Sequence, residues 1–138
     1  MATRIQHPAT AFALTGGMKR PRQAAPNHLR FVHGLPCLVC GKPGEAAHIR
    51  MGSVRHGRRG TGVGERPSDL WTVPLCPAHH REGPDAQHGA NETAWWAAHG
   101  IDPFVVAALL WAHTGDLEAA MLVCENATSF GGLNDGKK

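Results

Sequence analysis

The sequence has few charged and few aromatic residues, and it contains no long apolar run. Of its 138 residues, 18% are charged and 6% are aromatic, whereas 17 are glycine and 10 are proline. This composition excludes a coiled coil and a collagen-like rod. The best apolar run, residues 103–112, is far too short to span a bilayer, so we expect no membrane span. The N-terminal region lacks a long apolar core followed by a cleavage site, so we also expect no secretory signal.

Enough apolar residues remain for one compact core. They make up 42% of a 14.7 kDa chain, which is the size of a single domain. We predict a basic N-terminal arm over residues 1–26, one domain over residues 27–128 and a tail over residues 129–138. Ten histidines and four cysteines are a high count for so small a chain, and their spacing decides what they mean.

The net charge of +3 conceals two oppositely charged halves. Residues 1–66 contain eleven Lys/Arg and two acids, which gives +9, whereas residues 67–138 contain three Lys/Arg and nine acids, which gives −6. A cationic arm accounts for residues 1–22. It does not account for the arginines of the Gly-rich loop expected over residues 51–65 and its flanks, which are Arg50, Arg55, Arg58, Arg59 and Arg66. We therefore predict that these five arginines face a polyanion.

The pattern predicts a mixed α+β domain. We expect a strand over residues 45–49, an extended segment over residues 68–75 and a short helix after Pro77. Three further helices are expected: Asn91 and Asp102 cap the first two, and the third begins at Asp116. The first of these three ends at Gly100.

Three cysteines and one histidine have the spacing of zinc ligands. Cys37-x-x-Cys40 is followed by Cys76-x-x-His79, and two such pairs supply the four ligands of a tetrahedral structural zinc. Two disulfides or simple burial of the thiols are the alternatives, but a histidine cannot join a disulfide. Cys124 lies on the apolar face of the last predicted helix, so we assign it to the core.

A second group of residues has side chains that suggest a catalytic role rather than a structural one. His48 ends the first predicted strand, Asp69 lies in the extended segment, and His80 and His88 follow the second ligand pair. Together they place a potential base, a carboxylate and two imidazoles around one cleft. An imidazole with a pKa near 7 can activate water, and a divalent ion can polarise a phosphate oxygen. We expect His56, in the loop, to be exposed.

These motifs together resemble the HNH (ββα-metal) endonuclease superfamily, in particular phage recombination-enhancement nucleases and related phage domains. The resemblance spans residues 35–88 and rests on the following motifs in their order: Cys37-x-x-Cys40, Ala47-His48-Ile49, Pro67-Ser68-Asp69-Leu70-Trp71, Pro74-Leu75-Cys76 and His79-His80. It implies a small zinc-stapled, treble-clef-like ββα-metal core followed by C-terminal helices. The family often has a metal ligand at the position that Ala47 occupies here.

The resemblance also implies roles for the second group. His48 takes the place of the general base. Asp69 falls near a position where the family usually has Asn, which orients the base or supports the metal. His80 and His88 take the positions of metal ligands, so that His80, His88 and Asp69 would hold a catalytic Mg, Mn or Zn ion. The implied activity is cleavage or nicking of DNA in phage recombination or DNA processing, in a bacterial cytoplasm, with a recombinase or another phage replication protein as partner. Because nothing in the sequence resembles a base-reading helix, we expect little sequence specificity.

Two other functions stay open from the sequence. A zinc-binding DNA adaptor without catalysis is consistent with Ala47, because the loss of a ligand position can leave a binding scaffold. A zinc module that binds another protein is the third possibility.

Overall fold

A computed structural model of the chain describes residues 24–62, 65–89 and 91–131. Most of the predicted N-terminal arm lies outside these ranges, as do residues 132–138 of the predicted tail. None of the helices in the described ranges is long and apolar enough to cross a bilayer.

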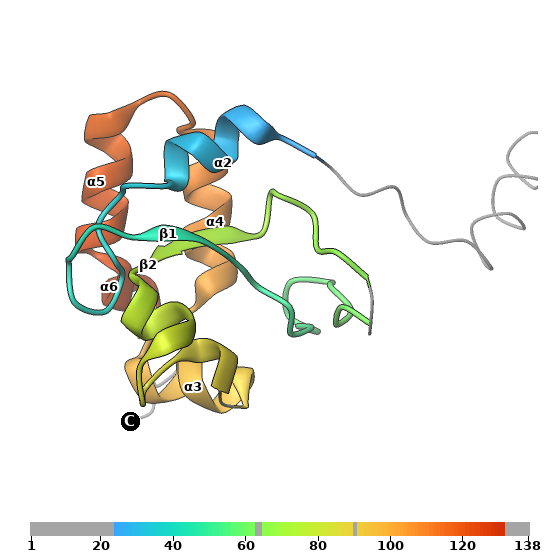
Figure 1. The fold of residues 1–138 in the computed structure, drawn as a ribbon. Coiled ribbons are helices and arrows are strands. Elements are labelled where there is room, and N and C mark those ends of the chain that lie inside the picture. The colour runs from blue at the N-terminus through green and yellow to red at the C-terminus, as the bar shows by residue number, and fades with distance from the viewer. Residues whose placement is uncertain (1–23, 63–64, 90, 132–138) are drawn as a thin grey trace, which may run out of the picture.

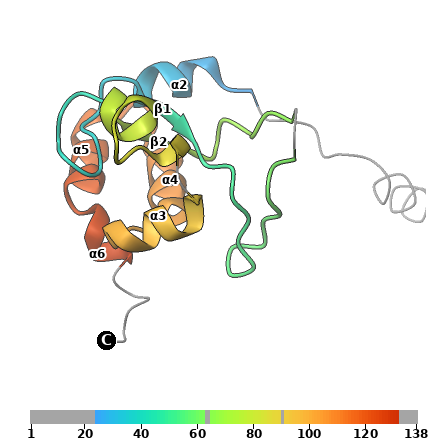
Figure 2. The same cartoon turned by 60° about the horizontal axis from the view of Figure 1, so that its bottom comes forward.

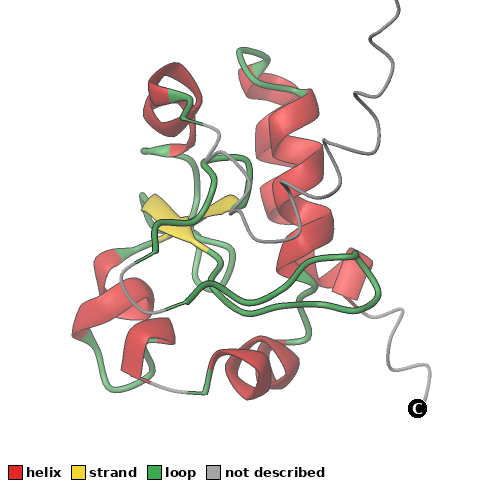
Figure 3. Cartoon of the chain, turned by 90° about the vertical axis from the view of Figure 1, so that its right-hand side faces the viewer, coloured by secondary structure: helices red, strands yellow, loops and turns green. Residues whose placement is uncertain are grey.

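The domain has α+β character, as the sequence predicts, with one small sheet among several helices (Figures 1 and 3). Strands β1 (Glu45–His48) and β2 (Thr72–Leu75) pair antiparallel, with Ala47 opposite Val73. The strand predicted over residues 45–49 is confirmed. The extended segment becomes a strand only at Thr72, because residues 68–71 form a turn in which the Trp71 amide bonds to the Ser68 carbonyl.

Helices surround this hairpin. They are α2 (Pro26–Val32), the π-helical turn η1 (Ala78–Glu82), the 3-10 turn η2 (Gln87–Gly89), α3 (Glu92–His99), α4 (Pro103–Ala112), α5 (Leu117–Glu125) and α6 (Ala127–Gly131). Helix α4 packs against β2, α5 and α6, whereas α2 packs against both strands. Helix α6 continues to residue 131, three residues beyond the domain boundary predicted at residue 128.

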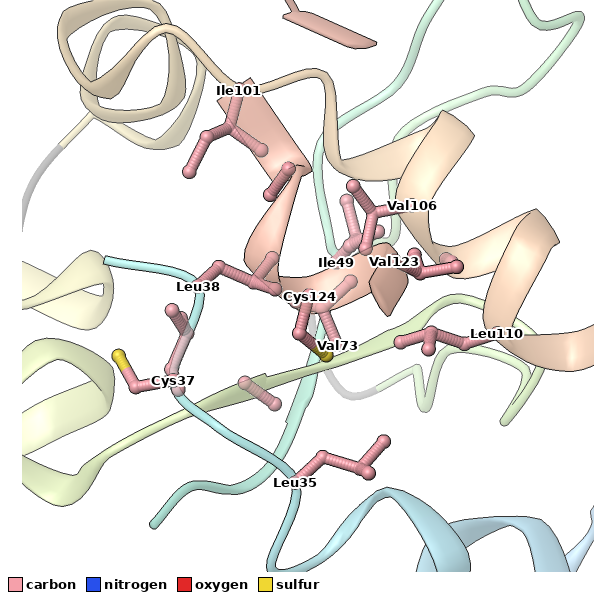
Figure 4. Packing of buried hydrophobic residues seen from close by; sticks show 14 of the residues in the cluster. Leu35, Cys37, Leu38, Ile49, Val73, Ile101, Val106, Leu110, Val123 and Cys124 are labelled. Atoms are coloured by element: carbon pink, nitrogen blue, oxygen red, sulfur yellow. The ribbon is translucent and has the colours of Figure 1, made fainter. Parts of the chain in front are cut away.

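The core forms where α4 and α5 meet the hairpin (Figure 4). Val106 and Leu110 of α4 lie close to Val73 of β2 and to Val123 and Cys124 of α5. All five side chains are buried, and Cys124 is only 4% exposed. The prediction that Cys124 belongs to the core is therefore confirmed.

The predicted caps Asn91 and Asp102 and the predicted helix start at Asp116 are confirmed, because capping depends on local chemistry. The side chains of Asn91, Asp102 and Asp116 each accept a hydrogen bond from a backbone amide in the first turn of the following helix. Gly100 ends α3 with a φ of +68°, a left-handed conformation that glycine adopts without strain.

Asp102 also holds the Gly-rich loop. One carboxylate oxygen caps α4, and the other lies 3.0 Å from His56 Nε2. The His56 ring packs on Phe104, with centroids 5.2 Å apart, and its side chain is only 23% exposed. The expectation that His56 is exposed is therefore wrong, because its partners lie 46 and 48 residues further along the chain.

Replacing Asp102 with alanine is expected to lower the free energy of unfolding by about 2 kcal/mol, since it removes a buried cap and the anchor of His56. Asp116→Ala is the matched control, because Asp116 caps α5 from an exposed position and should cost about 1 kcal/mol or less. Urea unfolding measures both. Equal losses would contradict an anchoring role for Asp102.

His28 of α2 is buried and neutral at pH 7. It is 2% exposed, its Nδ1 lies 2.7 Å from Thr114 Oγ1, and its ring packs edge-on against Trp111. Burial lowers the pKa of His28 below its usual value, although the charge of Asp69 opposes this effect. The imidazole therefore takes up a proton more readily in the unfolded chain than in the folded one.

The stability of the domain is therefore expected to fall as the pH drops below about 6.5, where the unfolded state begins to bind the extra proton. The measurement is urea unfolding at about pH 7.5 and about pH 5.5, with His28→Gln as the comparison, because glutamine keeps a polar contact with Thr114 but does not titrate. If the variant loses as much stability between the two pH values as the parent does, His28 is not the cause.

Candidate functional site

The four predicted zinc ligands come together at one end of the hairpin. Cys37 and Cys40 lie on the turn before β1, whereas Cys76 and His79 follow β2, so the antiparallel pairing brings the two ligand pairs face to face. Gly41 completes the turn after Cys40 with a φ of +81°. One ligand atom from each of the four side chains lies within 4.8 Å of all the others.

The distances between these ligand atoms fit the tetrahedral coordination of one metal ion. Zinc binds thiolate at about 2.3 Å, which places two sulfur ligands about 3.8 Å apart. Here Cys40 Sγ and Cys76 Sγ are 3.6 Å apart, and His79 Nδ1 is 3.3 Å from Cys76 Sγ and 3.8 Å from Cys37 Sγ. The group could therefore bind a metal ion such as zinc.

The thiol pKa of Cys76 differs from that of Cys124. Burial raises the pKa of Cys76, but hydrogen bonds from the backbone and ring of His79 and from the neighbouring thiols outweigh it and lower the pKa to about 7. Burial instead raises the pKa of Cys124 to about 12. Because metals bind the thiolate, Cys76 is suited to ligation, whereas Cys124 is inert.

His48 and Asp69 form a close pair beside the sheet. Asp69 is 1% exposed, and its Oδ1 lies 2.9 Å from His48 Nε2. Its Oδ2 accepts a hydrogen bond from the Ala25 amide at 2.8 Å. With Nε2–H donated to the carboxylate, Nδ1 of a neutral His48 ring keeps its lone pair and can accept a proton.

His80 and His88 form a second pair, with ring centroids 4.5 Å apart. Glu45 of β1 accepts from His80 Nδ1 at 2.6 Å and from Arg81 Nε at 2.8 Å. The Arg81 contact, with help from His80, lowers the pKa of Glu45, so the carboxylate is charged. A carboxylate on Nδ1 leaves Nε2 of His80 as the nitrogen that can bind a metal.

Desolvation lowers the pKa of His88, and the nearby His80 lowers it further. His88 is therefore neutral at pH 7, the state in which imidazole acts as a ligand. Asp69, by contrast, is buried behind His48 with both oxygens engaged. The Asp69 carboxylate is therefore positioned to orient the His48 ring.

His48 and His88 line one open hollow of about 450 Å³, together with Arg50, Gln87 and Glu92. Glu92 stabilises the lining of this hollow. Its carboxylate accepts hydrogen bonds from the backbone amides of Arg50 and Met51 and from the side chains of Gln87 and Trp96. Neither Glu45 nor Glu92 was predicted as part of the site, since neither belongs to a spaced motif.

The five arginines have different environments. Arg58 is half-buried: its guanidinium donates to the carbonyls of Met51 and Ile49 and lies 5.5 Å from the centroid of the Trp71 ring. It therefore stabilises the loop from inside rather than facing a polyanion. Arg59 pairs with Glu65, with nitrogen and oxygen 2.6 Å apart. Like Arg59, the other three are exposed, namely Arg50, Arg55 and Arg66.

The fold and the four-ligand group define an α+β domain with a candidate metal centre. The chain belongs to the family described as "Protein of unknown function (DUF968)", whose model matches residues 6–114. Over 64 residues the chain is 38% identical to "Uncharacterized protein YdfU" of Escherichia coli (strain K12), a match that covers 46% of this chain and 17% of YdfU. The chain thus spans less than a fifth of that relative's length. No solved structure matches.

Proposed function

We propose that this domain is a metal-dependent endonuclease of the HNH type, which cleaves or nicks DNA with little sequence specificity. The single observation that carries the proposal is the His48–Asp69 pair at 2.9 Å, whose histidine lines the hollow together with His88 and Arg50. The order of β1, β2 and η1 with the four-ligand group supports a zinc-stapled ββα-metal core.

We assign each residue of this site a role in phosphodiester hydrolysis. His48 Nδ1 accepts a proton from the attacking water, and Asp69 holds the ring in the tautomer that makes this possible and stabilises the imidazolium that results. His80 and His88 would hold a divalent ion, which when bound stabilises negative charge on the phosphate oxygens and the leaving group. Arg50 adds a fixed positive charge at the edge of the hollow.

Ala47 limits this proposal to two imidazole ligands. It is fully buried in the core opposite Val73, so a carboxylate at this position would face apolar side chains rather than the hollow. Water, phosphate oxygens or both would complete the coordination of the ion.

The test is a nicking assay with supercoiled plasmid and with single-stranded DNA, in the presence of Mg²⁺ or Mn²⁺. The proposal predicts nicking by the parent protein and loss of nicking in His48→Ala. Cleavage no greater than that of His48→Ala with either metal would refute it.

A DNA-binding adaptor is the second candidate, and Ala47 favours it. It predicts salt-sensitive DNA binding that is the same in the parent, His48→Ala and His80→Ala, with no nicking by any of them. The same set of proteins therefore distinguishes the two functions.

A further inference from the structure

A second hollow, of about 400 Å³, lies beside His80. It is lined by residues of α2, β1 and η1, which are Leu29, Arg30, His33, Glu45, Ala46, His80 and Arg81. His80 lines this hollow and its ring packs on His88, which lines the first one. The two hollows therefore meet at this histidine pair. Figure 2 shows the turn η1, in yellow-green, between α2 and α3 on the face turned toward the viewer.

The charge of the second hollow is positive. Arg30 and His33, one helical turn apart at the end of α2, are both exposed. Glu45 is the acid of this hollow, and Arg81 and His80 both contact its carboxylate. Among the described residues, Arg30 has a hydrogen bond with the neutral side chain of Asn27 and no ion pair. The charge of Arg30 is therefore available to an anion.

We propose that this second hollow binds the phosphate backbone of the DNA strand whose scissile phosphate occupies the first hollow. The inference rests on the proposed function and assigns α2 a part in it. Arg30 and His33 would contact one or two phosphates beside His80, while Arg50 lines the first hollow. Leu29 and Ala46 offer apolar surface against which a deoxyribose ring can pack.

The test compares two exposed cations in an inactive background. Arg30→Gln and Lys42→Gln are each combined with His48→Ala, so that DNA stays intact, and binding of a fluorescent single-stranded oligonucleotide is measured over a range of salt concentrations. Lys42 is the matched control, because it is exposed and lines neither hollow.

Losing one phosphate contact is expected to weaken binding by Arg30→Gln about three- to tenfold and to reduce the slope of log K against log salt by about 0.7, the value for single strands. Lys42→Gln should leave both nearly unchanged. His33→Gln is a second variant, and we expect it to weaken DNA binding by a smaller factor than Arg30→Gln does. Thermal unfolding confirms that the variants are folded.

If Arg30→Gln binds DNA as tightly as Lys42→Gln and has the same salt slope, the proposal is overturned. Failure of the proposed nuclease function would give a different result. A protein that never nicks DNA, but binds it less tightly in Arg30→Gln, refutes the nuclease and supports the phosphate site on α2.

Discussion

Replacing His48 with alanine is expected to lower the rate of DNA nicking by about 10²- to 10⁴-fold, the usual contribution of a positioned general base. The loss should appear in the rate at saturating DNA, since His48 acts on water rather than on the strand. The rate is measured as conversion of supercoiled to open-circular plasmid. Binding of DNA should change little.

A second histidine–aspartate pair in the same chain provides the control. His56 lies 3.0 Å from Asp102 and is 23% exposed, the same exposed fraction as His48, but it does not line the hollow. His56→Ala is expected to keep the rate at saturating DNA. If the two variants lose activity equally, the His48–Asp69 pair is structural, and the general base must be sought elsewhere.

Removing the metal of the four-ligand group is expected to unfold the domain. A structural zinc contributes about 10–16 kcal/mol to the folding of a small zinc domain, as much as the whole stability of many domains of about 5–15 kcal/mol. Cys40→Ser should therefore lose bound zinc and its cooperative thermal transition. Cys40 is exposed, so a serine there would cost almost nothing if Cys40 were not a ligand.

Cys124→Ala is the matched control for zinc content. Its thiol is buried in the core, so alanine removes apolar contacts and should cost about 1 to 2 kcal/mol, but the protein should keep one zinc per chain. Elemental analysis gives the metal content, and calorimetry gives the transition. A Cys40→Ser protein with unchanged zinc content and unchanged melting temperature would exclude the zinc site.

Local features of this chain could be predicted because their partners are near in sequence. A cap needs only the amides two or three residues ahead, so the starts of α3, α4 and α5 could be predicted from Asn91, Asp102 and Asp116. In each ligand pair, the two residues that separate the ligands likewise allow both side chains to reach one ion. The sequence therefore predicts that residues 37–40 and 76–79 form one site.

The atomic contacts within the candidate catalytic site could not be predicted from the sequence. His48 and Asp69 were placed in one cleft, yet their sequence positions do not say which atom faces which. Only the fold shows that Asp69 is buried and that its two oxygens contact His48 Nε2 and the Ala25 amide. The orientation depends on the turn before β2, which the sequence presents as a continuous extended segment.

By itself, the sequence determined the α+β class, the four-ligand group, the helix starts and the assignment of Cys124 to the core. The tertiary structure alone decided that Arg58 supports the loop from inside, that His56 binds Asp102, and that Glu45 orients His80. The physical reason is sequence separation. Glu45 and His80 are 35 residues apart, and only the packing of η1 against the hairpin brings the carboxylate to the ring.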